Sequence, residues 1–352
     1  MDPAFHSHRR WSRWGRWPRW AQLGRAGLVG SLIAIGAGLV GVIVVTSGGG
    51  TPQIDLNPLA DLAQVLPTAT VLADASTLTN CLAADDSSIY WQDDSNGGSI
   101  LKVAKTGGAV SIVAMGGVDK RACAVVDGTD VYFTTVGATA ITKAPKAGGG
   151  AQTSVATGQN VLGPLALEGG FVWWATDVYG AVDAFNGMNA VVRAPVGGLT
   201  GATEVMYNAV VGNVSGLKVS ASTIFVSDAA GVYGIDRNSM TKLSYGMSSV
   251  HNNLFDLDSQ NLVMVEVTGF GAGGIVSYRL DGTNRKVLTK KLATLLFLDG
   301  TNVFAKENAD LVRIPLDGTG LVPVAAEAPR AIVVDQTKIY FTDGTHILSL
   351  AK

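Results

Sequence analysis

Histidine, the side chain most often used for proton transfer at neutral pH, is scarce in this sequence. His6 and His8 lie near the N-terminus, which leaves His251 and His346. The neighbours of His251, "SSVHNNLF", are neutral and offer no carboxylate to orient an imidazole. The sequence has no G-x-S-x-G elbow, H-E-x-x-H pair or phosphate-binding loop, although a Ser-His-Asp triad needs no sequence proximity. Catalysis, with His251 as general base, is therefore the less favoured hypothesis.

Acidic residues recur at one point of the sequence pattern and raise the question of a metal site. They follow the centre of an aromatic or apolar segment by three positions and are Asp93, Asp228, Glu266, Glu307 and Asp343. No D-x-D-x-D-G loop gathers oxygen ligands for calcium, and the two cysteines have no nearby histidines for zinc. We therefore expect turn-forming and hydrogen-bonding roles for these acids, with no metal and no cofactor.

An internal repeat positions these residues. The segments "LAADDSSIYWQDD", "AVVDGTDVYFTTV" and "IVVDQTKIYFTDG" each contain an apolar strand, an acidic turn residue and an aromatic residue five positions later. Four further segments keep this offset. The turn positions are Asp85, Asp127, Glu168, Ser220, Asp258, Asp299 and Asp335. The residues five positions later are Tyr90, Tyr132, Trp173, Phe225, Val263, Phe304 and Tyr340.

The spacing of the repeats indicates the fold. The units follow one another at 42, 41, 52, 38, 41 and 36 residues, the length of a four-stranded propeller blade. A third strand and a Gly turn complete each unit, as in "ILKVAKTGG" and "ITKAPKAGGG". We therefore predict an all-β, seven-bladed β-propeller over residues 67–352. Six or eight blades are less favoured, and a β-sandwich is the alternative fold.

These repeats resemble a known kind of propeller. "IYWQDD" and "IYFTDG", each followed by a further strand, are similar to the repeats of bacterial extracytoplasmic β-propellers of the YWTD and NHL-like type. The resemblance covers about Ala69 to the C-terminus, and "NLVMVEV" departs from it. It implies a propeller scaffold but leaves activity open, because such motifs identify architecture and some related rings are lyases or lactonases.

The two ends of the repeat region predict how the ring closes. The final unit supplies only three strands, "AIVVD", "KIYFTD" and "HILSLAK". A bare sheet edge invites aggregation, so we expect residues 68–76, "TATVLADAS", to add the fourth strand. Cys81 and Cys123 each lie four residues before a turn acid, in adjacent inner strands where a disulfide is feasible. Two thiols without a bridge are the alternative.

The N-terminal segment predicts a membrane anchor. Arginine and tryptophan alternate in "RRWSRWGRWPRW", residues 9–20, and residues 26–46 carry no charge. A helix of that length, at about 1.5 Å per residue, crosses about 30 Å of hydrocarbon. Six arginines precede the run and the next basic residue is Lys102. We therefore predict residues 1–25 in the cytoplasm, a transmembrane helix at 26–46 and a linker at 47–66.

This arrangement also predicts partners and location. Arginine is attracted to anionic headgroups and indole suits the interface, so residues 9–46 should contact membrane lipid. We expect a bacterial inner-membrane protein with its propeller in the periplasm or outside the cell. An uncleaved signal anchor is favoured over a cleaved signal peptide. Without its first 46 residues, which hold six arginines and Asp2, the chain has 20 basic and 27 acidic side chains, which argues against nucleic acid.

Three long connections indicate where function lies. "ATDVYGAVDAFNGMN", "MYNAVVGNVSG" and "EVTGFGAGG" all belong to the propeller face that holds the strand-two to strand-three and the blade-to-blade connections. We expect this face to bind a protein or glycan partner. The candidate binding residues are Tyr179, Asp183, Phe185, Asn186, Tyr207, Asn208 and Phe270. The alternative is a lyase or lactonase-like enzyme with its site on the same face.

The arginine asymmetry gives a topology prediction. A reporter fused after Lys352 should be active only outside the cytoplasm, because the basic side of a membrane span stays inside. A matched fusion after Arg25 should show the opposite compartment. Cytoplasmic activity of the fusion after Lys352 would contradict both the predicted location and the predicted disulfide.

Overall fold

The computed structural model describes residues 32–36, 39–43, 66–75, 81–93, 97–119, 123–161, 163–177, 188–198, 203–211, 214–228, 231–246, 254–267 and 273–352. The chain forms two units, Met1–Val65 and Leu66–Lys352.

The first unit contains two short strands, β1 (Leu32–Gly36) and β2 (Leu39–Ile43), which pair antiparallel. Both lie inside residues 26–46, where the sequence predicts a helix. An uninterrupted apolar run has neither helical nor strand periodicity, and its many Val, Ile and Gly residues also suit a strand. The described part of the chain contains no helix that could span a bilayer. The transmembrane helix therefore stays a prediction.

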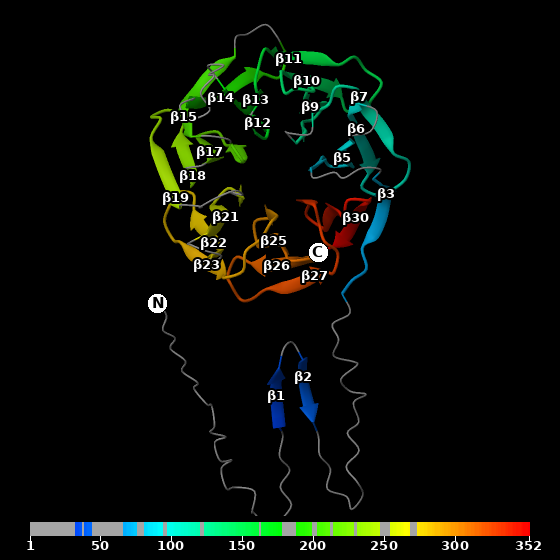
Figure 1. Cartoon of the computed structure of the whole chain (residues 1–352), viewed down its shortest axis with the longest axis vertical. Helices are drawn as coiled ribbons and strands as arrows, with labels where there is room; N and C mark the ends of the chain where they lie inside the picture. Colours follow the sequence, from blue (N-terminus) through cyan, green and yellow to red (C-terminus); the bar gives the residue numbers. More distant parts are fainter. Residues whose placement is uncertain are drawn as a thin grey trace, which may run out of the picture. The chain divides into compact units, whose positions relative to one another are not determined.

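The second unit is a ring of seven four-stranded antiparallel sheets (Figure 1), which confirms the predicted seven-bladed propeller. Blade 1 comprises β4 (Leu82–Ala84), β5 (Ser88–Asp93), β6 (Ser99–Ala104) and β7 (Ser111–Met115). Blade 2 comprises β8 (Val125–Val126), β9 (Asp130–Thr134), β10 (Ala140–Pro145) and β11 (Thr153–Thr157). Blade 3 comprises β12 (Ala166–Glu168), β13 (Phe171–Asp177), β14 (Met188–Pro195) and β15 (Glu204–Val211).

The next three blades repeat this order from the centre of the ring outward. Blade 4 comprises β16 (Gly216–Val219), β17 (Thr223–Asp228), β18 (Gly231–Asp236) and β19 (Lys242–Gly246). Blade 5 comprises β20 (Phe255–Leu257), β21 (Asn261–Val267), β22 (Gly273–Arg279) and β23 (Lys286–Thr289). Blade 6 comprises β24 (Leu296–Leu298), β25 (Asn302–Glu307), β26 (Asp310–Pro315) and β27 (Val322–Ala325).

Blade 7 closes the ring with strands from both ends of the propeller. It comprises β28 (Ala331–Val334), β29 (Lys338–Thr342), β30 (His346–Ala351) and β3 (Thr70–Asp74). The first and last strands pair antiparallel, with Thr70 opposite Ser349 and Asp74 opposite His346. Figure 1 shows β3 beside β30. The predicted closure by residues 68–76 is confirmed.

The hydrophobic core lies between blades, and the repeated aromatic position builds it. Each of the seven residues that the sequence places five positions after a turn residue is buried and packs toward the following blade. The adjacent residue on the same strand faces the preceding blade because strand side chains alternate. In blade 3, for example, Trp173 packs toward blade 4 and Trp174 toward blade 2.

The offset of five has a direct physical cause in three blades. In blade 1, Asp85 Oδ1 accepts hydrogen bonds from the backbone N–H groups of Ser87 and Ser88, which shapes the turn. Its Oδ2 atom accepts the Tyr90 hydroxyl at 2.8 Å. The same Asp–Tyr bond joins Asp127 to Tyr132 and Asp335 to Tyr340. One carboxylate thus orders the turn and satisfies the phenol of a buried ring.

A cation from the following blade completes several of these turns. Lys146 of blade 2 pairs with Asp85 at 2.8 Å, and Lys105 of blade 1 pairs with Asp335 at 2.9 Å. Lys352 likewise pairs with Asp299 at 2.8 Å. We call each such turn acid, its aromatic or apolar partner five residues later and the residue from the next blade an inter-blade clasp.

Where the cation is missing, an apolar side chain occupies the equivalent position. Val196, Leu280 and Leu316 stand at the place of Lys105 in blades 3, 5 and 6, and each packs against the preceding blade. Arg237 of blade 4 instead places its guanidinium 4.9 Å from the centre of the Trp173 ring. The clasps therefore seal neighbouring blades by charge in some places and by apolar contact in others.

Strand β3 gives a prediction about folding. Deleting residues 1–60 should leave a monodisperse, cooperatively unfolding propeller, because all four strands of blade 7 remain. Deleting residues 1–76 removes β3, so the edge of β30 loses its partner and the protein should aggregate. Size-exclusion chromatography and thermal unfolding would measure both variants, and equal behaviour would contradict the closure.

The clasps predict a loss of stability in acid. Burial raises the pKa of Asp85, but hydrogen bonds from Lys146, Ser87, Tyr90 and Ser88 outweigh burial and hold that pKa well below its ordinary value. Burial also raises the pKa of Asp335, but hydrogen bonds, chiefly that from Lys105, outweigh burial and lower this pKa in the same way. A lowered native pKa stabilises the fold above the unfolded pKa, and this contribution is lost as the pH falls below about 4.

We therefore expect Asp85→Asn and Asp335→Asn to lower the free energy of unfolding at neutral pH and to make it less sensitive to acid. Denaturant unfolding at about pH 7 and about pH 3 would measure this difference. Asp86→Asn, at the exposed neighbour of Asp85, is the matched control. An acid-induced loss as large in both variants as in the wild type would contradict the role of the clasps.

Candidate functional site

The two faces of the ring differ in their connections. The lower face carries the turns from first to second and from third to fourth strands, where the clasps lie. The upper face carries the hairpins from second to third strands and the connections between blades. Of the predicted binding residues, Tyr179, Asp183, Phe185, Asn186 and Phe270 lie outside the described residues, as does His251.

The structure places Tyr207 and Asn208 in β15, the outermost strand of blade 3. The expectation that this segment is a blade-to-blade loop is wrong, because its Val, Met and Tyr side chains favour a strand that pairs with β14. The Tyr207 ring is partly buried, 6.3 Å from the Tyr233 ring. Burial, together with the nearby Asp228 carboxylate, raises its pKa. Tyr207 is thus a packing residue, while Asn208 is exposed.

Cys81 and Cys123 are disulfide-bonded, with their Cα atoms 5.4 Å apart. They precede the inner strands β4 and β8 and link blades 1 and 2 at the centre of the ring. Inner strands also line an axial cavity of about 510 Å³, and most of the residues that line it are of apolar type. Inside it, Lys218 pairs with Asp256 at 3.0 Å, and Asp256 also accepts the backbone N–H of Leu298.

Among the described residues of the upper face, the recurrent acids have partners. Asp228 accepts the Tyr233 hydroxyl, Glu266 pairs with Arg285, and Glu307 pairs with Lys291. Asp343 bonds to the His346 ring at 2.9 Å. Residues 66–75, 81–93 and the other described segments contain no group of three or more His, Cys, Asp or Glu side chains that could hold a metal ion.

The interaction of Asp343 with His346 has a clear electrostatic effect. Burial raises the Asp343 pKa, but hydrogen bonds from His346 and Thr345 outweigh burial and lower it to about 2. The same hydrogen bond raises the pKa of His346. Asp343 is therefore ionised at neutral pH, and its carboxylate interacts with His346 of the same hairpin.

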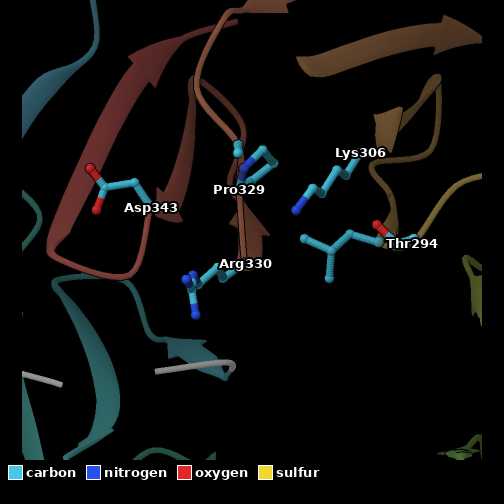
Figure 2. A pocket seen from close by; sticks show the side chains of 7 residues that line it. Thr294, Lys306, Pro329, Arg330 and Asp343 are labelled. Atoms are coloured by element: carbon cyan, nitrogen blue, oxygen red, sulfur yellow. The ribbon is translucent and has the colours of Figure 1, made fainter. Parts of the chain in front are cut away.

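A pocket of about 380 Å³ opens on the upper face between blades 6 and 7. It is lined by Thr294, Leu295, Lys306, Ala328, Pro329, Arg330 and Asp343. We call it the blade 6–7 pocket. Figure 2 shows the Lys306 amine extending toward the segment that carries Pro329 and Arg330, with Asp343 on the far side of that segment.

Two cations of the blade 6–7 pocket are not neutralised by described residues. Neither Lys306 nor Arg330 forms an ion pair with a side chain in the part of the chain that the structure describes. A second pocket, of about 330 Å³ in blade 5, has one such cation, Lys290, beside Arg285, which is paired with Glu266. The blade 6–7 pocket can therefore attract an anion.

Backbone hydrogen bonds fix the two segments that carry these cations. The Thr294 N–H donates to the Lys306 carbonyl at 3.2 Å, and the Arg330 N–H donates to the Thr342 carbonyl at 2.7 Å. Gly344 has a φ of 102°, and a β-carbon there would lie 2.6 Å from the Arg330 Nε atom. Glycine at position 344 thus permits the turn and leaves room for the Arg330 side chain.

Sequence reasoning did not select Lys306 or Arg330, although the repeat contains a signal. Lys306 lies seven residues after its turn position, and the equivalents in the other repeats are Gln92, Thr134, Ala175, Ser227, Val265 and Thr342. Arg330 lies five residues before its turn position, and its equivalents are Asn80, Ala122, Gly163, Ser215, Asn253 and Thr294. Each is thus the one charged residue at its repeat position.

Comparison with known proteins supports the fold. The sequence matches no protein-family model and no curated protein. An oligogalacturonate lyase in complex with manganese is similar in structure, with a TM-score of 0.62, 13% identity and coverage of 81% of this chain and 96% of that chain.

Two further solved structures are similar. BamB from Moraxella catarrhalis has a TM-score of 0.51 at 14% identity, covering 82% of this chain and 94% of that chain. The extracellular domain of a one component system from B. thetaiotaomicron has a TM-score of 0.54 at 13% identity, covering 81% of this chain and 40% of that chain. The similarity in structure establishes that the chain shares the β-propeller fold with these proteins. Identities this low leave its function to be argued from its own residues.

Proposed function

We propose that this chain is a membrane-tethered, extracytoplasmic binding module whose propeller, of the YWTD/NHL-like repeat type, holds a protein or glycan partner on its upper face. Residues 1–25 lie in the cytoplasm, residues 26–46 anchor the chain and residues 47–66 link the anchor to the propeller. The arginine bias and the uncharged run support this topology. The Cys81–Cys123 bridge is consistent with an oxidising compartment, where disulfides persist.

The observation that carries the proposal is the blade 6–7 pocket on the upper face. Backbone hydrogen bonds hold the segments that carry its two cations, and neither cation is paired with a described carboxylate. Charged side chains on the lower face are instead used between blades. A rigid ring that carries charged groups without ion-pair partners on one face is suited to binding a ligand there.

The long connections extend this face. Residues 178–187 join β13 to β14, and residues 268–272 join β21 to β22, so both leave blades at the ends where upper-face hairpins begin. Tyr179, Asp183, Phe185, Asn186 and Phe270 belong to these connections, and we propose them as partner-contacting residues. Tyrosine and phenylalanine supply large contact areas at interfaces.

One experiment separates a binding module from a lyase or lactonase-like enzyme. The propeller would be screened against envelope proteins and a glycan array, and the captured partner would then be titrated against variants. Tyr179→Ala and Phe185→Ala should weaken binding by about 1 to 4 kcal/mol, as for aromatic anchors of an interface. His251→Ala should bind as the wild type does.

Leu243→Ala is the matched control, because Leu243 is exposed on the outer strand β19, away from the upper-face connections. In an enzyme, His251 would be the general base, and its removal would reduce turnover by about 100-fold or more with folding unchanged. Substrate turnover that disappears in His251→Ala but survives both aromatic substitutions would replace the binding module with the enzyme.

A further inference from the structure

We propose that the blade 6–7 pocket binds the anionic group, carboxylate or phosphate, of a small sugar-sized ligand. Lys306 and Arg330 line the pocket from the two sides of the segment that carries Pro329 and would attract the anion. This inference rests on the proposed binding function and names the chemistry of one site within it.

The repeat itself shows that these two cations are not part of the fold. Residues at the Lys306 position in blades 1, 2, 4 and 7 are polar, neutral and buried, such as Thr134 and Ser227. Blade 4 shows how such a pair is satisfied internally, because the Ser215 and Ser227 hydroxyls lie 3.0 Å apart. Since six blades form without charge at each of these positions, blade packing does not require the charge of Lys306 or Arg330.

The carboxylates near the pocket are paired with residues other than Lys306 and Arg330, so both cations can interact with a ligand. Glu307 is engaged by Lys291 at 2.5 Å, and Asp343 is engaged by His346 at 2.9 Å. These pairs take up the two carboxylates nearest in sequence to the hairpin ends of β25 and β29. An ammonium and a guanidinium are then the groups available to an incoming anion, and both form strong charge-assisted hydrogen bonds with carboxylate or phosphate.

The backbone of the site is held in place before a ligand arrives. Backbone hydrogen bonds tie Thr294 to Lys306 and Arg330 to Thr342, so the backbone that carries each cation is already paired without a ligand. Pro329 is buried and immediately precedes Arg330, and its ring restricts the backbone of the connection that carries Arg330. A preorganised site avoids the cost of ordering side-chain-bearing segments on binding.

The size and lining of the pocket favour a small ligand over a folded protein surface. Its volume of about 380 Å³ lies in the range of small-molecule sites. A stable protein interface instead buries about 800 Å² on each partner. Beside the cations, Thr294 offers a hydroxyl and Leu295 offers apolar surface. Hydroxyl and apolar groups next to a charge match a sugar that carries an acid group.

A matched series of three sugars tests the proposal with the purified full chain. Glucuronate, glucose 6-phosphate and glucose share one ring and differ in the anionic group. Isothermal titration should show binding of at least one anionic sugar and no binding of glucose. The stronger of the two anions identifies carboxylate or phosphate as the natural group, and raising the salt concentration should weaken it.

Substitutions then locate the site. Lys306→Met and Arg330→Met should each weaken anion binding by about tenfold or more, the expected loss of a charge-assisted hydrogen bond. Lys338→Met, at the lower-face start of β29, makes the same change of net charge and should bind as the wild type does. Thermal unfolding of each variant would verify that the propeller remains folded.

Gly344→Ala offers a second route that keeps both charges. It places a methyl group against the Arg330 side chain, so it should also weaken anion binding. Equal affinity for glucose and the anionic sugars, no binding of either anionic sugar, or unchanged binding in Lys306→Met and Arg330→Met would each overturn the inference.

Failure here is distinguishable from failure of the proposed function. Partner capture that depends on Tyr179 and Phe185, with no anion binding, would remove this site and leave the binding module standing. Loss of both, with turnover dependent on His251, would remove the two together.

Discussion

The structure depends on the contact between the second strand of one blade and the sheet of the next. In each repeat a buried residue, aromatic in six of the seven, packs toward the following blade, and the turn five residues earlier lies at the edge of that contact. Asp85, Asp127 and Asp335 bond to the tyrosine hydroxyl and so remove the cost of burying a polar atom. Blades cohere because seven such contacts run around the ring.

The need for this inter-blade contact gives the charged residues of the two propeller faces different roles. On the lower face, carboxylates and lysines are consumed between blades, as in Lys146 with Asp85 and Lys352 with Asp299. On the upper face no clasp is needed, so its charged residues can differ from blade to blade. Lys306 and Arg330 are the result in blades 6 and 7, where they line a pocket rather than a blade contact. A binding site there does not compete with the packing of the ring.

The ring also accommodates its ends and its insertions without altering that contact. Strand β3 supplies the outer strand of blade 7, so the chain enters the propeller on its rim and leaves the axial region to inner strands. The disulfide lies at the inner ends of blades 1 and 2, close to where the ring begins. In our proposal an anchored ring of this kind displays its upper face to a partner outside the cytoplasm.

The sequence by itself determined the seven blades and the closure, because the offset of five between a turn residue and a buried aromatic or apolar residue is a local property that recurs in every unit. It also indicated which face carries the long connections. It did not determine whether inserted residues form loop or strand, and Tyr207 and Asn208 lie in β15 because β14 offers a partner that only pairing reveals. Lys306 and Arg330 belong to different repeats, and each is ordinary in its own segment. Only the packing of blade 6 against blade 7 brings them to one pocket, since inter-blade proximity depends on the whole ring rather than on any one segment.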